Sequence, residues 1–148
     1  MSTKDTNPKD GIGATKPPLS TVPMPVVHEV GLALLEGACK YRRHNYRVYG
    51  VRASVYFDAT QRHLNKWWEG EDIDPDSGLS HITKAIASLF VLRDAMIQDM
   101  VKDDRPPITR PEFWAQLEVA TKNILARFPM PAAPHTELGE AEKEEGQD

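Results

Sequence analysis

An acidic segment, residues 69–81 (EGEDIDPDSGLSH), contains the residue types that point most directly to chemistry. It carries five carboxylates within eight positions: Glu69, Glu71, Asp72, Asp74 and Asp76. Two tryptophans precede it and an apolar helical pattern follows it, so these like charges lie beside segments that are expected to be buried. Carboxylates held this close repel one another, and a bound divalent cation would relieve the repulsion.

Clustered carboxylates serve either acid/base catalysis or cation binding. Glycoside-type acid/base pairs need two groups at a set distance in a wide aromatic cleft, and nothing else in the sequence resembles one. An EF-hand loop that started at Asp72 would need a glutamate at its twelfth position, where Thr83 stands. Glu71 and Asp74 can instead turn toward one cation, and Glu36 from an earlier helix can complete the set. Carboxylate ligands without cysteine favour Mg²⁺ or Mn²⁺ over Zn²⁺.

The acidic segment also has a purely structural interpretation. The letters DPDSG are typical of a turn, and Asp76 or Ser77 is suited to cap a following helix. A solvated acidic turn is therefore the alternative to a metal site.

The helix predicted for residues 25–41 carries a narrow polar stripe. At about 100° per residue, Glu29, Glu36 and Lys40 fall in a gap between two apolar arcs. A surface helix normally has a wide polar face, so Glu36 is expected to point into a cleft or a subunit interface. The alternative is a surface glutamate that pairs with Lys40 four residues further on.

Three further helices are predicted from apolar periodicity. Residues 54–68 place His63 in the apolar register, where a packed, hydrogen-bonded histidine is the common outcome. Residues 77–100 follow a near-heptad pattern. A last helix is predicted to begin with a capping box at Thr109 and Glu112 and to end before Pro129.

These segments define the expected fold class, which is all-α: a four-helix bundle with no convincing run of β period. Apolar residues occupy more than one face of the helices at 25–41 and 77–100, which is more than a four-helix monomer requires. The sequence therefore predicts an oligomer.

Composition divides the chain of 148 residues into three parts. Residues 1–24, rich in proline, are predicted to form an extended arm without a helix. Residues 25–129 form the helical domain. Residues 130–148 hold six acidic residues against Lys143, and are predicted to be a disordered acidic tail. The chain's net charge of −4 becomes +1 without that tail.

The single cysteine, Cys39, lies in an apolar segment and is expected to be a packed thiol. One cysteine excludes an intramolecular disulfide framework, and a reducing compartment is the natural one. No signal-peptide pattern and no apolar run of about eighteen residues occurs, so we expect a cytoplasmic protein without a membrane anchor.

The connector at residues 40–52 (KYRRHNYRVYGVR) is basic, with five lysines and arginines, three tyrosines and no acid. It is suited to contact phosphates, and a solvated loop that balances the acidic segment is the alternative. A helical module that binds nucleic acid or a replication protein through this connector is the rival function. That module predicts salt-sensitive DNA binding without a metal requirement.

Three blocks of sequence together resemble a known family: NPKDGIGATKPPLSTVP near the start, LLEGACKYRRHNYR in the middle, and RHLNKWWEGEDIDPDSGLSH after it. The sequence is similar to the small MazG-like nucleotide pyrophosphohydrolases of phages. Within these it resembles the dATP/dGTP diphosphohydrolase type, which is associated with genomes that replace adenine by 2-aminoadenine. The resemblance covers roughly residues 7–95.

The resemblance implies an all-α, oligomeric, Mg²⁺-dependent enzyme, as a homodimer or homotetramer, with carboxylates in an E-x-x-E and then an E-x-x-D pattern. Glu71 and Asp74 match the second half. Glu36 matches one member of the first half, and Cys39 stands where its second acid would be. The implied reaction is hydrolysis of dGTP or dATP to the monophosphate and pyrophosphate, so nucleic acid is not the expected partner.

The resemblance also implies roles for individual residues. Metal would be held by Glu36, Glu71 and Asp74. Phosphates would meet Lys40 and one or more of Lys9, Lys16 and Arg62. Groups around the site would be oriented by Asn45, His63 and His81. The arm, with Gly11 and Ile12, would close over the base. Within the same fold, a general or pyrimidine-directed house-cleaning enzyme is the alternative.

Overall fold

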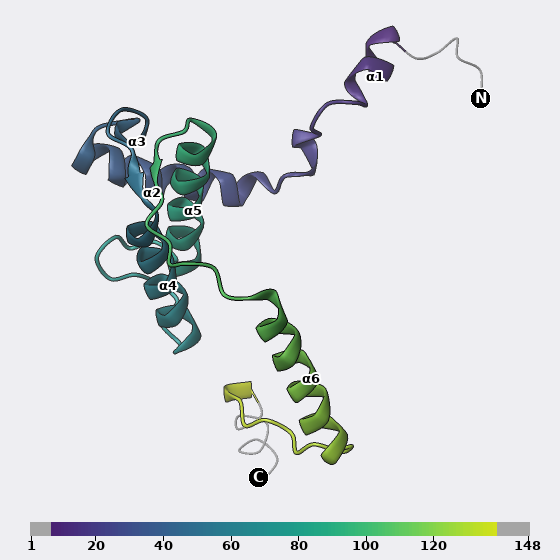
Figure 1. The fold of residues 1–148 in the computed structure, drawn as a ribbon. Coiled ribbons are helices and arrows are strands. Elements are labelled where there is room, and N and C mark those ends of the chain that lie inside the picture. Colours follow the sequence, from purple (N-terminus) through teal and green to yellow (C-terminus); the bar gives the residue numbers. More distant parts are fainter. Residues whose placement is uncertain (1–6, 139–148) are drawn as a thin grey trace, which may run out of the picture. The chain divides into compact units, whose positions relative to one another are not determined.

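The structure is a computed structural model that describes residues 7–138, and the chain divides into two units, Met1–Arg105 and Pro106–Asp148 (Figure 1). The chain is mostly helical, as predicted. In chain order the first unit contains α1 (Pro8–Gly13), the 3-10 helix η2 (Leu19–Thr21), α2 (Met24–Tyr41), α3 (Asn45–Val48), β1 (Val51–Arg52), α4 (Ala53–Trp68), α5 (His81–Ile97) and β2 (Val101–Lys102). The second unit contains α6 (Pro111–Arg127).

Helix α5 is the central element of the first unit, because it packs against both α2 and α4 (Figure 1). One hydrophobic cluster joins Val30 and Ala33 of α2 to Ala87 of α5. A second cluster joins Val91 and Ala95 of α5 to Val51, which directly precedes α4. The buried residues are small, so the helices approach closely, and polar groups on their facing sides come within reach of one another.

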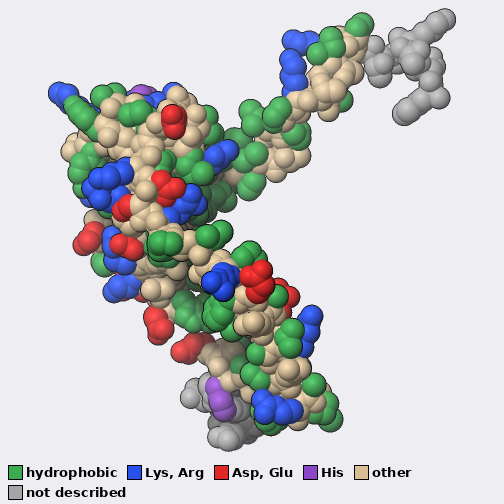
Figure 2. All heavy atoms as spheres, viewed as in Figure 1, with side chains coloured by type: hydrophobic (Ala, Val, Ile, Leu, Met, Phe, Trp, Pro, Cys, Tyr) green, Lys and Arg blue, Asp and Glu red, His purple; other side chains and the backbone are tan. Residues whose placement is uncertain are grey.

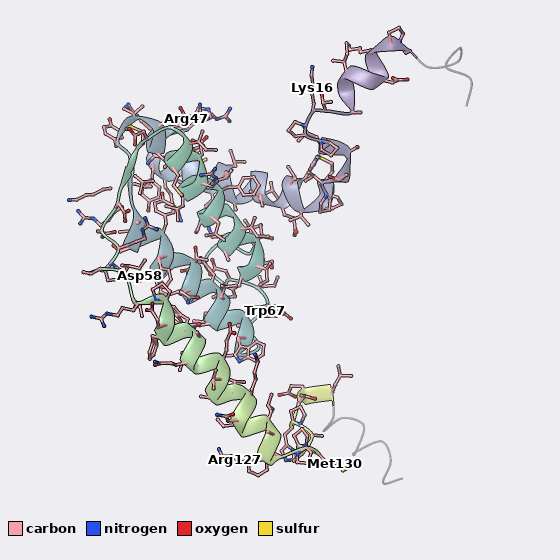
Figure 3. All side chains as sticks on the ribbon, turned by 45° about the vertical axis from the view of Figure 1, so that its right-hand side comes forward. Lys16, Arg47, Asp58, Trp67, Arg127 and Met130 are labelled. Atoms are coloured by element: carbon pink, nitrogen blue, oxygen red, sulfur yellow. The ribbon has the colours of Figure 1, made fainter. Side chains whose placement is uncertain are left out.

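A tight backbone contact at Gly50 holds the segment between α2 and α4 beside the end of α5. β1 pairs with β2 in parallel, and the Val51 amide donates to the Met100 carbonyl at 2.9 Å. Gly50 has a φ of +73°, and a Cβ at this position would lie 2.5 Å from the Met100 carbonyl oxygen. Nearby, Arg47 (labelled in Figure 3) forms two hydrogen bonds with Asp94 of α5, at 2.9 and 2.7 Å. These contacts fix the connector to α5.

The acidic segment folds as a compact loop between α4 and α5. The Asp74 amide donates to the Leu79 carbonyl at 2.8 Å, and the Gly78 amide donates back to the Asp74 carbonyl at 2.8 Å. The predicted start of the third helix at Ser77 is wrong, because α5 begins at His81 and Ser80 is its N-cap. The Ser77 hydroxyl and the Asp76 amide both donate to the Asp74 carboxylate within the loop, so neither of the two predicted caps, Asp76 and Ser77, starts the helix.

The N-terminal segment contains short helices, so the prediction that it is extended is wrong for its described part. Asn7 caps α1 by accepting a hydrogen bond from the Lys9 amide at 3.0 Å, and Pro8 occupies the first helical position. Proline disrupts helix interiors but is compatible with this position. Residues 1–6, and residues 139–148 of the predicted disordered tail, lie outside the described residues.

Three other expectations are corrected. Cys39 is exposed, because it lies on the apolar arc of α2 that turns away from α5. The two-residue strands β1 and β2 occur in a chain for which no strand was predicted. Arg110, without a side-chain hydrogen bond, is the N-cap of α6, so the capping box at Thr109 does not form. Pro111 sets the first turn of that helix, which leaves Thr109 one residue too early to cap it.

The second unit, described by itself, is organised around α6. No residue of α6 is buried, and the apolar side chains of Phe113, Leu117 and Ile124, and of the C-cap Phe128, are at least 45% exposed. None of the described helices is long and apolar enough to cross a membrane.

The close contact at Gly50 predicts a strong effect of a single methyl group. Gly50→Ala adds a Cβ against the Met100 carbonyl and forces alanine into a left-handed conformation, so we expect a loss of at least about 1–2 kcal/mol in the free energy of unfolding. Urea denaturation measures it. The control is Gly31→Ala within α2, where a Cβ meets no described atom within 4 Å. It should be neutral or stabilising by up to about 1 kcal/mol. Equal stability of the two variants would contradict the prediction.

Candidate active site

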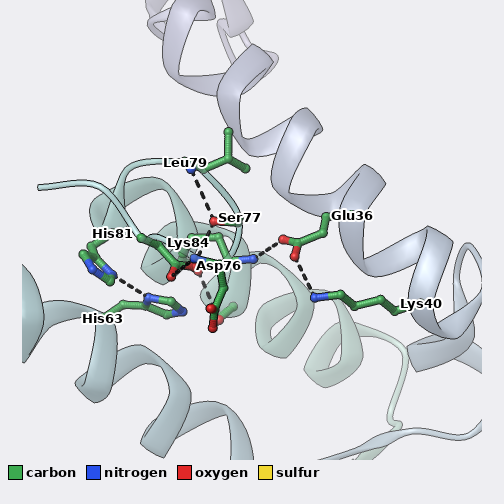
Figure 4. Close-up of polar contacts among 10 residues, drawn as sticks. Glu36, Lys40, His63, Asp76, Ser77, Leu79, His81 and Lys84 are labelled. Carbon is green, nitrogen blue, oxygen red and sulfur yellow. Dashed lines mark hydrogen bonds and ion pairs between the residues drawn. The ribbon is translucent and has the colours of Figure 1, made fainter.

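Glu36 lies at the centre of a group of charges on the facing sides of α2 and α5 (Figure 4). Its Oε1 accepts from Lys40 Nζ at 2.6 Å, within α2. Its Oε2 accepts from Lys84 Nζ of α5. The two lysines differ in environment, because the Lys84 side chain is 18% exposed and the Lys40 side chain is 55% exposed. Glu36 therefore joins two helices as well as forming the pair within one helix.

These two cations set the ionisation of the carboxylate. The hydrogen bonds from Lys40 and then Lys84 hold the pKa of Glu36 below its ordinary value of 4.5, although partial burial acts in the opposite direction. Glu36 is therefore an anion at neutral pH. The two ammonium groups more than compensate the single charge of the carboxylate, so Glu36 needs no other cation to stay ionised.

A second group of polar side chains connects the acidic loop to α4 and α5. His81, at the start of α5, is 3% exposed, and its Nε2 lies 2.7 Å from Glu71 Oε1. Its Nδ1 lies 2.9 Å from Nδ1 of His63 on α4. The prediction that His63 is packed and hydrogen-bonded is confirmed. Glu71, His81 and His63 thus form a continuous chain of hydrogen bonds.

The geometry of this chain restricts where its protons lie. One proton must occupy the space between the two Nδ1 atoms of His81 and His63. When neutral His81 donates to Glu71 from Nε2, its Nδ1 accepts from His63, and the Nε2 of His63 is left as a proton acceptor. Burial, followed by the neighbouring His81, lowers the pKa of His63, which favours its neutral form. His63 can therefore accept a proton, and Glu71 can stabilise the resulting positive charge through His81.

Asp74 is buried beside the same histidines. Its carboxylate accepts from the Ser77 hydroxyl at 2.8 Å and from the Asp76 amide at 3.2 Å. Burial acts to raise the pKa of Asp74, but these hydrogen bonds and the charges of His63 and His81 together lower it below its usual value. Asp74 is therefore a buried anion within the acidic loop.

The two groups are electrically coupled through Lys84. The charge of Lys84 lowers the pKa of His63, and the charge of Asp74 raises it. Figure 4 shows Glu36, Lys84, His63 and His81 in one region, contributed by α2, α4 and α5. Glu36, Glu71 and Asp74 thus each have a polar partner, and the charges of Asp74 and Lys84 both act on His63.

The oxygen donors of the described residues do not converge on one cation site. Across residues 7–138, no three His, Cys, Asp or Glu side chains are placed so that they could hold one metal ion. Both oxygens of Glu36 are engaged by lysines, and Glu71 is engaged by His81. The carboxylates are the ligand type that Mg²⁺ or Mn²⁺ prefers. Their positions, however, are those of a network of ion pairs and hydrogen bonds.

The other predicted residues are not joined to this network by described contacts. Lys9, Gly11, Ile12 and Lys16 are exposed, and the side-chain hydrogen bonds described within residues 7–16 stay inside that segment. Their predicted role of closing over the base stays a prediction. Arg62 is exposed on α4. Asn45 begins α3 and lines a cavity beside α2 and α5.

Two residues of the site, Lys84 and Ser77, were not predicted from the sequence. Lys84 was not singled out, although it is the one lysine among the apolar residues of the central helix, one turn after His81. That position was the available signal. Ser77 was assigned to helix capping, and only the fold of the loop shows that its hydroxyl holds Asp74.

Removing Lys84 should make stability depend less on pH. The lowered pKa of Glu36 means that its ion pairs contribute stability that is fully present above the unfolded value of 4.5 and is lost as pH falls through the folded pKa. Lys84→Met should therefore cost about 1 kcal/mol near neutral pH, and the difference from the wild type should shrink in acid. Urea denaturation across a pH series measures this.

The control for that comparison is Lys66→Met. Lys66 is an exposed residue of α4, and no ion pair involving it occurs among the described residues. This variant should show a small difference without the same acid dependence. A Lys84→Met difference that stays constant through acid pH would contradict the pairing.

Comparison with known families identifies the family of this chain. The sequence model described as "dATP/dGTP diphosphohydrolase, N-terminal" matches residues 6–105, which is more than half of the chain and contains every residue of the network. No curated protein and no solved structure matched the chain. The chain belongs to the dATP/dGTP diphosphohydrolase family and is a nucleotide pyrophosphohydrolase.

Proposed function

We propose that the enzyme hydrolyses dGTP and dATP to the monophosphate and pyrophosphate at the face that carries Glu36, Glu71 and Asp74. The observation that carries this is the Glu36 carboxylate between Lys40 and Lys84, next to the hydrogen-bonded chain from Glu71 to His63. Anionic and cationic groups together suit a reaction in which a water is activated and a phosphate charge is neutralised. The family assignment supplies the two purine substrates.

In this mechanism a water oxygen forms a bond to the α-phosphorus, and the bond from that phosphorus to the bridging oxygen breaks. The proton released by water passes to His63. The hydrogen bonds that connect His63 through His81 to Glu71 stabilise the charged form of His63. Lys40 and Lys84 turn from Glu36 toward the leaving pyrophosphate and neutralise its developing charge. The deoxynucleoside monophosphate then leaves with one phosphate.

Mg²⁺ or Mn²⁺ is proposed as the cofactor, with Glu36, Glu71 and Asp74 as the protein's ligands. A bound divalent cation would polarise the phosphate oxygens and lower the pKa of a bound water. Carboxylate oxygens are the ligands that these ions prefer, which supports the proposal. Glu36 would have to exchange its two lysines for the cation, and those lysines would then be available to the phosphates.

The enzyme is proposed to act as a homodimer or homotetramer. Apolar side chains of the first unit are well exposed in the single chain, as the green side chains in Figure 2 illustrate. On α2 these include Leu32 and Leu35, and on α5 Leu89 and Phe90, each close to half exposed. An exposed apolar surface on the two helices that carry the site is typical of a subunit interface.

The biological setting is proposed from the resemblance to the phage enzymes associated with 2-aminoadenine genomes. Hydrolysis of dATP would lower the supply of the ordinary adenine nucleotide. This supports a role in shaping the nucleotide pool for phage DNA that contains 2-aminoadenine.

A product assay tests the activity and the cofactor together. With Mg²⁺, we expect pyrophosphate release from dGTP and dATP with a kcat/KM at least about tenfold above that for dCTP and dTTP. Chelation by EDTA should stop the reaction, and added Mn²⁺ should restore it. Comparable turnover of dCTP or dTTP would support the general or pyrimidine-directed alternative. Turnover that continues in EDTA would contradict the cofactor.

Within the acidic loop, Glu71 and Glu69 make a matched pair of variants. Glu71→Gln removes the charge that stabilises His81 and His63, so kcat should fall on the order of 10²-fold or more with unchanged helical content by circular dichroism. Glu69→Gln changes an exposed carboxylate of the same loop and should keep activity within about twofold. Near-normal turnover by Glu71→Gln would remove Glu71 from the mechanism.

A further inference from the structure

A cavity of about 410 Å³ opens between α2, α5 and the segment that joins α2 to α4. Its volume lies within the range of roughly 300–1,000 Å³ that is usual for sites that bind small ligands. Small residues, Gly37 and Ala38 of α2 and Ala87 of α5, form part of its lining, and Tyr46 and Tyr56 form another part. The mechanism above makes no use of this space.

Two glycines of α2 keep the cavity open. Gly31 and Gly37 both line it, and a Cβ on either would meet no described atom within 4 Å. Glycine inside a helix costs about 0.5–1 kcal/mol relative to alanine. No contact among the described residues requires glycine at these two positions. The space beside them is therefore available to a molecule other than this chain.

The polar lining of the cavity fits an anionic ligand with a polar aromatic base. Arg42, Arg43 and Lys84 contribute positive charge, and no lining residue is acidic. The Asn45 side chain offers both a donor and an acceptor, which is the pair that an amide presents to a purine edge. Lys84 lines the cavity and also binds Glu36, so the cavity adjoins the candidate active site.

We propose that this cavity holds the purine base and deoxyribose of the substrate, with the triphosphate extending past Lys84 toward Glu36. The proposal rests on the proposed function and names the part of the molecule that selects the base. Tyrosine rings and small apolar residues accommodate the flat base, and Asn45 contacts its edge. Positive charge at Lys84 meets the phosphates where the base pocket joins the carboxylates.

The test fills the cavity from the helix. Gly37→Leu places a side chain in the open space while it improves helix propensity. The probes are a dGTP analogue with a non-hydrolysable α,β-methylene link and inorganic tripolyphosphate, titrated calorimetrically with Mg²⁺ present. We expect the analogue's Kd to rise at least about tenfold and the Kd of tripolyphosphate to stay within about twofold. Gly37→Ala should give a smaller loss in the same direction.

The control is His28→Leu, on the same helix, where the residue is exposed and does not line the cavity. It should bind both probes as the wild type does. Unchanged affinity of Gly37→Leu for the analogue would overturn the proposal, and so would an equal loss of tripolyphosphate binding. Light scattering compares the oligomeric mass of Gly37→Leu with that of the wild type. A different mass would mean that a second copy of the chain covers the cavity, and this would overturn the proposal too.

Hydrolysis by the wild type separates the two proposals. A wild type that releases pyrophosphate from dGTP, together with unchanged analogue binding by Gly37→Leu, refutes the base pocket alone. A wild type that releases none refutes the proposed function, whatever the binding results are.

Discussion

Carboxylates that lie close together repel one another, and each of the three at the centre of this enzyme has its own positive or hydrogen-bonding partner. Glu36 has two lysines, Glu71 has a buried histidine, and Asp74 has a hydroxyl and an amide. These partners come from α2, α5 and the acidic loop, so the charges can be held together only when these elements pack as they do. The close packing of small residues along α5 is therefore also what holds the charged side chains of the site together.

The same arrangement connects catalysis to recognition. Lys84 is bound to Glu36 and also lines the cavity, so in the proposed complex this one side chain would lie between the phosphates and the base. The basic connector supplies the cavity's far wall, and Gly50 with Arg47 fixes that connector to α5. A nucleotide that spans both regions would have its base and its reacting phosphorus positioned by one helix.

Much of this could be predicted from the sequence where the signal is local. Helix α2 and helix α4 begin within one residue of their predicted starts, because apolar periodicity depends on neighbours in the sequence. Lys84 could not be assigned, because its partner lies 48 residues away. Ser77 was misassigned because its choice between capping and binding Asp74 depends on the fold of the loop. The acidic cluster indicated a site, but its lysine and histidine partners became visible only in three dimensions.

The central claim is that these carboxylates and the neighbouring cavity form one site for a purine deoxynucleoside triphosphate. A crystal structure with the non-hydrolysable dGTP analogue and Mn²⁺, recorded at a wavelength where manganese scatters anomalously, tests it most directly. We expect an anomalous peak bound by Glu36, Glu71 and Asp74, with the phosphates beside Lys84 and the base against Asn45. Manganese and nucleotide bound elsewhere on the assembly, with Glu36 still paired to both lysines, would contradict it.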